Sequence, residues 1–133
     1  MTYPHTDRAN IELGLRTLAR VAGEASRERG FREHSDQVLT SGTQEQISTH
    51  ITSRVMLVVT ELAEAVEEIR AGRDPREVYY SDGGKPEGFS VEVADAVIRL
   101  GDLVEELKID LGTEVTRKLD YNETRARKHG KVI

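Results

Sequence analysis

The sequence contains no cysteine and no long apolar run among its 133 residues. Without cysteine the chain has no disulfide, no thiolate nucleophile and no cysteine-ligated zinc site, and this composition fits a reducing compartment. The amino-terminal stretch MTYPHTDRANIE has no apolar leader, and no apolar segment approaches the length that crosses a membrane. We therefore expect a cytoplasmic protein that has no membrane partner.

The chain also lacks a broad excess of positive charge, because its net charge is −5. Residues 117–131 sum to +4, which leaves −9 for the rest of the chain. A nucleic-acid binder needs a broad basic face, so we expect no nucleic-acid partner. One short basic segment in an acidic chain is better suited to holding a small polyanion. The length predicts a single domain over residues 1–133, with room for four or five helices.

Apolar residues recur at helical spacing in four stretches of the chain. Two of these stretches are apolar on two sides, which indicates a central position in a bundle or a contact between subunits. We therefore expect an all-α fold, a four-to-five-helix bundle that is completed by oligomerisation. The predicted helices cover residues 6–29, about 44–71, about 91–107 and about 111–127.

Polar residues predict where three of the helices begin. Thr43 and Gln46 have the form of a capping box, in which each side chain binds the other residue's backbone N–H. Ser90 and Asp110 are the expected N-caps of the two last helices.

Two connections separate the first three helices. Residues 30–43 are rich in Ser, Gly and Asp, which predicts a loop. Residues 72–90 contain four Gly and two Pro, with a weak strand signal at 77–80. A connection of this length is often functional or mobile.

Two couples of carboxylates interrupt otherwise apolar helical patterns: Glu61 with Glu64, and Glu92 with Asp95. Residues three apart lie on nearly the same side of a helix. Four acidic groups that converge inside a bundle repel one another and resist desolvation unless a cation compensates them. An oxygen-only set without histidine at ligand spacing favours Mg²⁺ or Mn²⁺ over zinc or di-iron. The alternative is that both couples lie on solvated helix faces.

A second polar pattern lies near the carboxyl terminus. Lys118, Tyr121, Asn122 and Arg125 follow the spacing i, i+3, i+4 and i+7, and Lys131 comes shortly after. Two cations, a phenol and an amide on one helix face are suited to binding phosphate oxygens. The alternative is that the cations offset the helix dipole in solvent. Beside a magnesium site, the set favours a nucleotide di- or triphosphate.

The spacing of these motifs resembles a known family. Glu61-x-x-Glu64, a spacer of 27 residues, Glu92-x-x-Asp95 and the ending KLDYNETRARKHGK are similar to the MazG-like superfamily of all-α nucleoside triphosphate pyrophosphohydrolases. The closest likeness is to small single-domain members, which are often found in phages and actinobacteria. It covers about residues 24–131 and includes the stretches MLVVTELAEAVEEIRAG and KPEGFSVEVADAVIRLGDL.

The resemblance implies a homodimer or homotetramer that hydrolyses an NTP or dNTP to the monophosphate and pyrophosphate with Mg²⁺. It also implies that Glu61 or Glu64 acts as the base or orients the attacking water. The implied metal ligands are Glu61, Glu64, Glu92 and Asp95. The implied phosphate-binding residues are Lys118, Tyr121, Asn122, Arg125 and Lys131.

Two alternatives stay open at this point. A non-catalytic helical module would bind a metal, a nucleotide or a protein partner without turnover. An enzyme like phosphoribosyl-ATP pyrophosphatase uses a similar acidic helix pair, although the long 72–90 segment argues against it. The sequence also departs from the family where Arg32 follows Phe31, since relatives often have an aromatic there, and base specificity stays open. Arg99 and Asp102 share a helix face with Asp95. They would either support the metal ligands from behind or form a surface ion pair, and we expect the ion pair.

Overall fold

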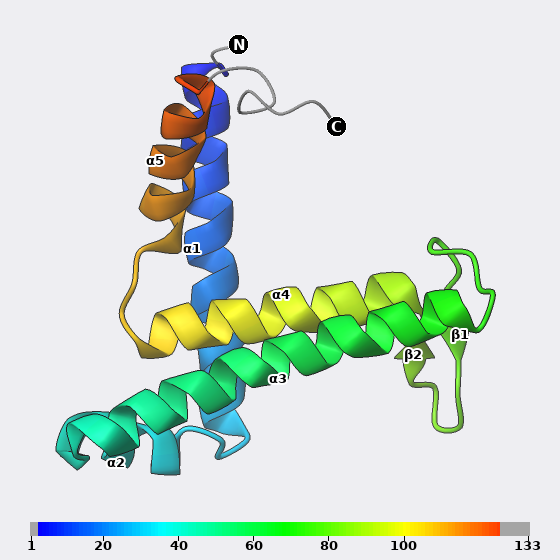
Figure 1. Ribbon diagram of the computed structural model, residues 1–133, viewed down its shortest axis with the longest axis horizontal. Coiled ribbons are helices and arrows are strands. Elements are labelled where there is room, and N and C mark those ends of the chain that lie inside the picture. Colours follow the sequence, from blue (N-terminus) through cyan, green and yellow to red (C-terminus); the bar gives the residue numbers. More distant parts are fainter. Residues whose placement is uncertain (1–2, 126–133) are drawn as a thin grey trace.

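The computed structural model describes residues 3–125, which form five helices and one short hairpin (Figure 1). The expected all-α class is confirmed. In the described part of the chain, no helix is both long and apolar enough to cross a membrane. The elements are α1 (His5–Glu28), α2 (Glu33–Ser41), α3 (Gln44–Arg70), β1 (Tyr79–Tyr80), β2 (Pro86–Glu87), α4 (Phe89–Glu106) and α5 (Leu111–Glu123).

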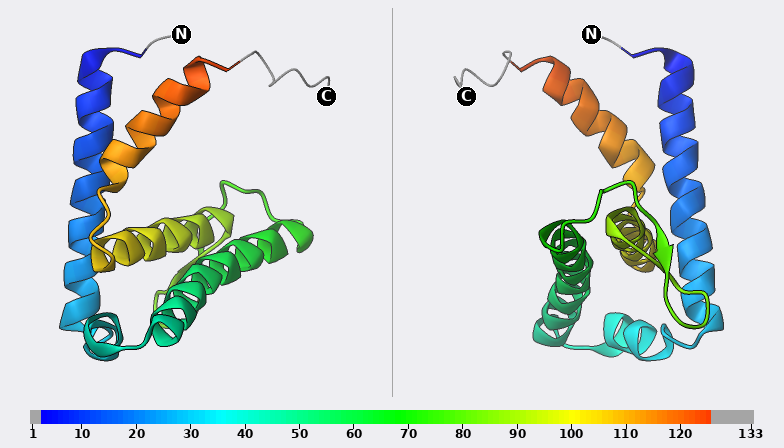
Figure 2. Two further views of the ribbon diagram at one scale, coloured as in Figure 1. Left: turned by 60° about the vertical axis from the view of Figure 1, so that its left-hand side comes forward. Right: turned by 90° about the vertical axis from the view of Figure 1, so that its right-hand side faces the viewer.

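The helices form two arms that meet where the second half of α1 packs against α4. α3 and α4 run antiparallel and side by side, and α1 crosses them steeply (Figures 1 and 2). α5 packs on the amino-terminal part of α1, away from the α3–α4 pair. This arrangement places α3 and α4 together as one layer, on which the predicted acidic couples face each other.

Small residues let α1 approach its neighbours closely. A Cβ built on Gly101 of α4 would lie 3.3 Å from Leu18 Cγ, and one on Gly112 of α5 would lie 2.7 Å from the carbonyl oxygen of Glu12. The buried apolar residues are also mostly small: Ala19, Ala22, Val58, Ala65, Ala96, Leu103 and Val104. The helices therefore pack through close backbone contact rather than through large side chains.

Two of the three predicted helix starts are confirmed. The Thr43 side chain accepts a hydrogen bond from Gln46 N at 3.1 Å, and Gln46 Oε1 accepts one from Thr43 N at 2.8 Å. Asp110 accepts from Thr113 N at 3.2 Å. The prediction for Ser90 is wrong, because α4 begins at Phe89 after Gly88, whose φ of 134° suits glycine.

The loop predicted over residues 30–43 is also wrong, because α2 occupies Glu33–Ser41. Arg32, at the N-cap, is only 3% exposed and binds Asp102 on α4. Buried Ser35 adds a second point of attachment on the helix itself. A short helix of weak intrinsic propensity is thus held by tertiary contacts that its own sequence does not reveal.

The segment between α3 and α4 is better ordered than its sequence suggests. β1 and β2 form an antiparallel hairpin that confirms the weak strand signal, with Tyr79 opposite Glu87. The Tyr79 hydroxyl donates to Glu68 Oε1 at 2.8 Å, and the Arg73 guanidinium lies 3.8 Å from the centre of the Tyr79 ring. The hairpin is therefore fastened to the end of α3.

α5 ends at Glu123, earlier than its expected end near residue 127.

Candidate functional site

The antiparallel pairing of α3 and α4 brings the predicted carboxylates together. Glu61, Glu92 and Asp95 each offer one oxygen, and these three oxygens all lie within 4.8 Å of one another. Among residues 3–125 these three form the one group of His, Cys, Asp or Glu side chains placed to hold a metal ion, and Glu64 is not among them. Glu64 lies beside Glu92 and raises the pKa of that carboxyl. We call Glu61, Glu64, Glu92 and Asp95 the carboxylate cluster.

Burial differs among the four members of the carboxylate cluster. Glu61 is 8% exposed, whereas Glu92 and Asp95 are half-buried. Glu64 is exposed at the edge. The cluster is therefore a partly dry pocket of oxygens that opens to solvent on the Glu64 side, which is not the arrangement of a fully solvated helix face.

The environment raises the pKa of Glu92 from its ordinary value of 4.5 to about 7. Burial is the largest cause, followed by the hydrogen bond with Glu64 and the negative charge of Glu64. The hydrogen bond with Glu61 and the charge of Asp95 act in the same direction. Facing carboxylates without enough positive charge retain a proton in this way. A divalent cation is the natural replacement for that proton.

One protein cation contacts the carboxylate cluster. Arg99 Nε donates to Glu61 Oε1 at 2.5 Å. Among residues 3–125, no other Lys or Arg forms an ion pair with the cluster. The predicted surface pair between Arg99 and Asp102 is wrong, because Asp102 is 8% exposed and is bound by Arg32 and Arg54 instead.

A cavity of about 260 Å³ adjoins the carboxylate cluster. Glu61, Asp95 and Arg99 border it on one side, and the end of α1 with Phe31 borders it on the other. Phe31 is 66% exposed, so its ring is accessible to a ligand. The cavity can therefore accept the organic part of a ligand whose other part is held at the carboxylate cluster.

Further along α4, a second acidic group is neutralised by the protein itself. We call this set the α4 ion network, and its members are Arg27, Arg32, His50, Arg54, Asp102, Glu105 and Glu106. The Arg32 Nη2 atom lies 2.6 Å from Asp102 Oδ1 and 2.5 Å from Glu105 Oε2. Arg54 reaches Asp102 Oδ2 at 2.6 Å. Arg27 also pairs with Glu105.

Glu106 lies deepest in the α4 ion network, with a side chain that has no exposed surface. His50 Nε2 lies 2.6 Å from Glu106 Oε1, and Arg54 Nη2 lies 3.3 Å from Glu106 Oε2. Burial raises the pKa of Asp102, but hydrogen bonds from Arg54 and Arg32 lower it by more, so the net pKa is lowered. The network joins α1, α2, α3 and α4, and sequence reasoning missed it because its members are far apart in the chain.

The basic face predicted on α5 is present, but it lies away from the carboxylate cluster. Lys118 Nζ is 4.8 Å and Arg125 Cζ is 5.9 Å from the centre of the Tyr121 ring, so these three side chains share one exposed side; Asn122 is exposed on the same helix. We call Lys118, Tyr121, Asn122 and Arg125 the basic face. Lys131 lies outside the described residues.

The basic face and the carboxylate cluster lie at opposite ends of α1. α5 is attached near the start of α1, where Arg8 pairs with Asp120 at 2.5 Å, whereas Ala22 borders the cavity beside the cluster. Arg8 and Ala22 are separated by 14 positions, or about 21 Å along a helix axis. One chain therefore does not bring the predicted metal ligands and the predicted phosphate-binding residues together.

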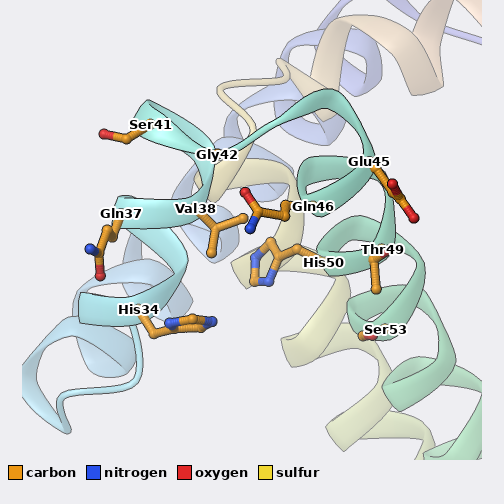
Figure 3. A pocket seen from close by; sticks show the side chains of 10 residues that line it. All are labelled: His34, Gln37, Val38, Ser41, Gly42, Glu45, Gln46, Thr49, His50 and Ser53. Carbon is orange, nitrogen blue, oxygen red and sulfur yellow. The ribbon is translucent and has the colours of Figure 1, made fainter.

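A larger cavity of about 610 Å³ lies between α2 and the first half of α3 (Figure 3). His34 projects toward it from α2, and Gln46 and His50 project toward it from α3. His50 belongs to the α4 ion network, which fixes its ring against Glu106. Sequence reasoning does not predict this cavity, because it assigns residues 30–43 to a loop.

No protein-family model, curated protein or solved structure matches this chain. The likeness to MazG-like enzymes therefore stays a prediction that rests on the motifs quoted above.

Proposed function

We propose that the protein is a magnesium-dependent nucleoside triphosphate pyrophosphohydrolase, which converts an NTP or dNTP to the monophosphate and pyrophosphate. The observation that carries the proposal is the convergence of Glu61, Glu92 and Asp95 oxygens within 4.8 Å of one another on two facing helices. The raised pKa of Glu92 supports it, because it reports a local deficit of positive charge. An all-carboxylate donor set fits Mg²⁺, with Mn²⁺ as a substitute.

The four carboxylates have different parts in this proposal. Glu61, Glu92 and Asp95 hold the ion, and Glu64 completes the set from the solvent side. A bound Mg²⁺ would lower the pKa of a coordinated water and neutralise phosphate charge. Glu64 is the exposed member and has no cation beside it among residues 3–125, so we assign it the role of base or water-orienting group. Glu61 is bound by Arg99 and is better suited as a ligand.

We propose further that the enzyme is a homodimer. Several large apolar side chains of α3 are about half exposed, including Met56 at 52%, Leu62 at 45% and Val66 at 53%. On α4, Val97 and Ile98 are 42% and 48% exposed. An apolar surface of this kind on two adjacent helices marks a contact with another protein surface. A second copy would cover it and would supply the basic face that one chain holds away from its own carboxylate cluster.

A nucleotide panel tests the activity. Ribo- and deoxyribonucleoside triphosphates and phosphoribosyl-ATP are incubated with and without Mg²⁺, and monophosphate and pyrophosphate are quantified. We expect Glu64→Gln to lower the rate at least about 100-fold, the usual effect of removing a general base. Glu67→Gln is the matched control, because Glu67 is exposed one turn later on α3 and pairs with Arg70 at 3.4 Å. Equal activity of Glu64→Gln and wild type would refute the assignment.

A complementation assay tests the homodimer. Glu64→Gln protein and a Lys118→Ala/Arg125→Ala double variant are each expected to be inactive alone. When they are mixed and allowed to exchange subunits, some dimers contain one intact cluster facing one intact basic face, so activity should return. No recovery, together with a monomeric mass from light scattering, would refute the shared site.

The non-catalytic module is the main alternative. It predicts that Mg²⁺ binds to the carboxylate cluster while no nucleotide in the panel releases pyrophosphate. Calorimetric binding of Mg²⁺, measured beside the activity panel, separates the two functions.

A further inference from the structure

Arg99 is exposed, and it differs from the buried and half-buried arginines in how it uses its donors. Its Nε donates to Glu61 Oε1 at 2.5 Å, and within residues 3–125 Glu61 is its one ion-pair partner. An arginine side chain carries five N–H donors, so the four on its two terminal nitrogens have no acceptor in the part of the chain that the structure describes. Its side chain is 43% exposed and borders the cavity beside the carboxylate cluster.

Two of the three arginines in the α4 ion network, Arg32 and Arg54, show the contrast, whereas Arg27 is 45% exposed and pairs with Glu105 alone. Arg32 is 3% exposed and binds Asp102 through both Nε and Nη2, and Nη2 also reaches Glu105. The Arg54 side chain is 16% exposed and contacts Asp102 and Glu106. These side chains are enclosed and bind two carboxylates each. Arg99 makes a single contact from an open position, which suits a group that moves.

Resting on the proposed function, we propose that Arg99 is a displaceable counter-charge. It binds Glu61 while the carboxylate cluster lacks a metal ion, and it leaves Glu61 when the ion binds. Its guanidinium then contacts the phosphate groups of the nucleotide. Arg99 thus adds a phosphate contact from the same chain that carries the carboxylate cluster. It lies one turn after Asp95 on α4, and the sequence predicts that it pairs with Asp102.

Electrostatics favours the displacement of Arg99. Arg99 and a divalent cation would compete for the same Glu61 oxygen, and the positive charge of Arg99 beside the cluster lowers the affinity for the ion. Once released, the guanidinium has a planar fork that matches phosphate oxygens in a bidentate arrangement. Its exposure and its place at the cavity edge allow this movement without opening the core.

Two binding measurements on the full chain test the proposal without relying on turnover. Isothermal titration calorimetry gives the affinity for Mg²⁺ alone, and then for pyrophosphate in saturating Mg²⁺. We expect Arg99→Gln to bind Mg²⁺ about threefold to tenfold more tightly than wild type, because a competing charge is gone. We expect it to bind pyrophosphate at least about tenfold more weakly, because a bidentate donor is gone.

Arg99→Lys keeps the charge but loses the fork. It should restore Mg²⁺ affinity to near the wild-type value while leaving pyrophosphate affinity low, by about threefold or more. Arg70→Gln is the matched control, because Arg70 is 74% exposed and pairs with Glu67 on the same helix. We expect it to change neither affinity.

The competing explanation is that Arg99 merely orients Glu61 as a ligand. In that case Arg99→Gln would weaken Mg²⁺ binding or leave it unchanged, and either result overturns the proposal. Absence of Mg²⁺ binding to wild type overturns both this proposal and the proposed function. If both expected affinity shifts occur but no nucleotide is hydrolysed, the role of Arg99 stands and the hydrolase activity does not.

Discussion

The two ends of α4 carry the same kind of side chain in opposite electrostatic settings. Near its start, Glu92 and Asp95 face two more carboxylates on α3, and the pKa of Glu92 is raised to about 7. Near its end, burial raises the pKa of Glu105, but hydrogen bonds from Arg27 and Arg32 lower it by more. The same helix therefore holds one acidic group that lacks cations and another that is supplied with them.

This difference distinguishes an acidic group that stabilises the fold from one that is suited to binding a ligand. The α4 ion network joins four helices and is closed, because protein cations neutralise its buried acids. Among residues 3–125, the carboxylate cluster has one exposed arginine for four acids, which leaves a local deficit of positive charge. Because protein cations are scarce at the start of α4 and plentiful at its end, the start of α4 is the end that is suited to binding a metal ion. The following predictions test that distinction.

The largest effect is expected from Arg32→Ala in the α4 ion network. It removes a cation that is 3% exposed and leaves Asp102 and Glu105 short of partners. Breaking a buried ion pair in this way lowers the free energy of unfolding by about 3–5 kcal/mol. Urea unfolding measures the change. Arg20→Ala is the control, because its pair with Glu24 is exposed, and it should change stability by less than about 1 kcal/mol.

A pair of aspartate variants should show opposite effects. Asp102→Asn weakens two buried ion pairs and should lower thermal stability while leaving Mg²⁺ binding intact. Asp95→Asn should leave stability nearly unchanged without Mg²⁺ but remove the stabilisation that Mg²⁺ gives wild type, which is about 2.7 kcal/mol at 100 times the dissociation constant. Denaturant unfolding of each variant with EDTA and with Mg²⁺ measures both effects. Equal responses of the two variants would contradict the distinction.

The pH dependence of Glu92 gives a smaller effect. The pKa of Glu92 is about 7 in the folded protein and 4.5 ordinarily, so the folded state binds more protons between these values. Stability of the metal-free protein should therefore fall as pH rises from about 4.5 to 7, by on the order of 1–2 kcal/mol after solvent screening.

Glu92→Gln has no carboxyl group that ionises, so the fall in stability with rising pH should shrink. At pH 8 in EDTA the variant should be more stable than wild type, because a repelled charge has been removed. Urea unfolding at pH 5 and pH 8 provides the comparison. A variant that is less stable than wild type at pH 8 would show that Glu92 is already compensated.

The smallest effect is expected from His50→Gln. His50 supports Glu106 at 2.6 Å, but Arg54 also lies 3.3 Å from the same carboxylate. Because one partner remains and glutamine can still donate a hydrogen bond, we expect a loss of about 1 kcal/mol. Chemical denaturation measures it, with Thr49→Ala as a neighbouring control on α3. A loss as large as that of Arg32→Ala would show that the network depends on His50 rather than on its arginines.

The sequence predicted the carboxylate cluster because its determinants are local. A spacing of three on each helix aims two carboxylates one way, and an antiparallel pair of helices then needs only the right register to join them. The capping box of Thr43 and the cap at Asp110 were predictable for the same reason, since each involves residues three apart.

The missed features depend on distant partners. Arg32 starts α2 by binding Asp102, 70 residues away, and no local periodicity records that contact. Arg99 was assigned to Asp102 from their shared helix face, but it reaches across to Glu61 on α3 instead. The position of the basic face depends on where α5 packs along α1. Helical spacing predicts which side of a helix a residue occupies but not which neighbour it meets.

The packing of α1 has a consequence for how the chain folds during synthesis. α1 packs chiefly against α4 and α5, and α4 begins about 60 residues after α1 ends. At roughly 5–20 residues per second, α1 leaves the ribosome several seconds before its partners exist. In that interval the first helix has no tertiary support, and the chain is most exposed to proteases and to association with other nascent chains. Folding is therefore a late event that waits for the last third of the sequence.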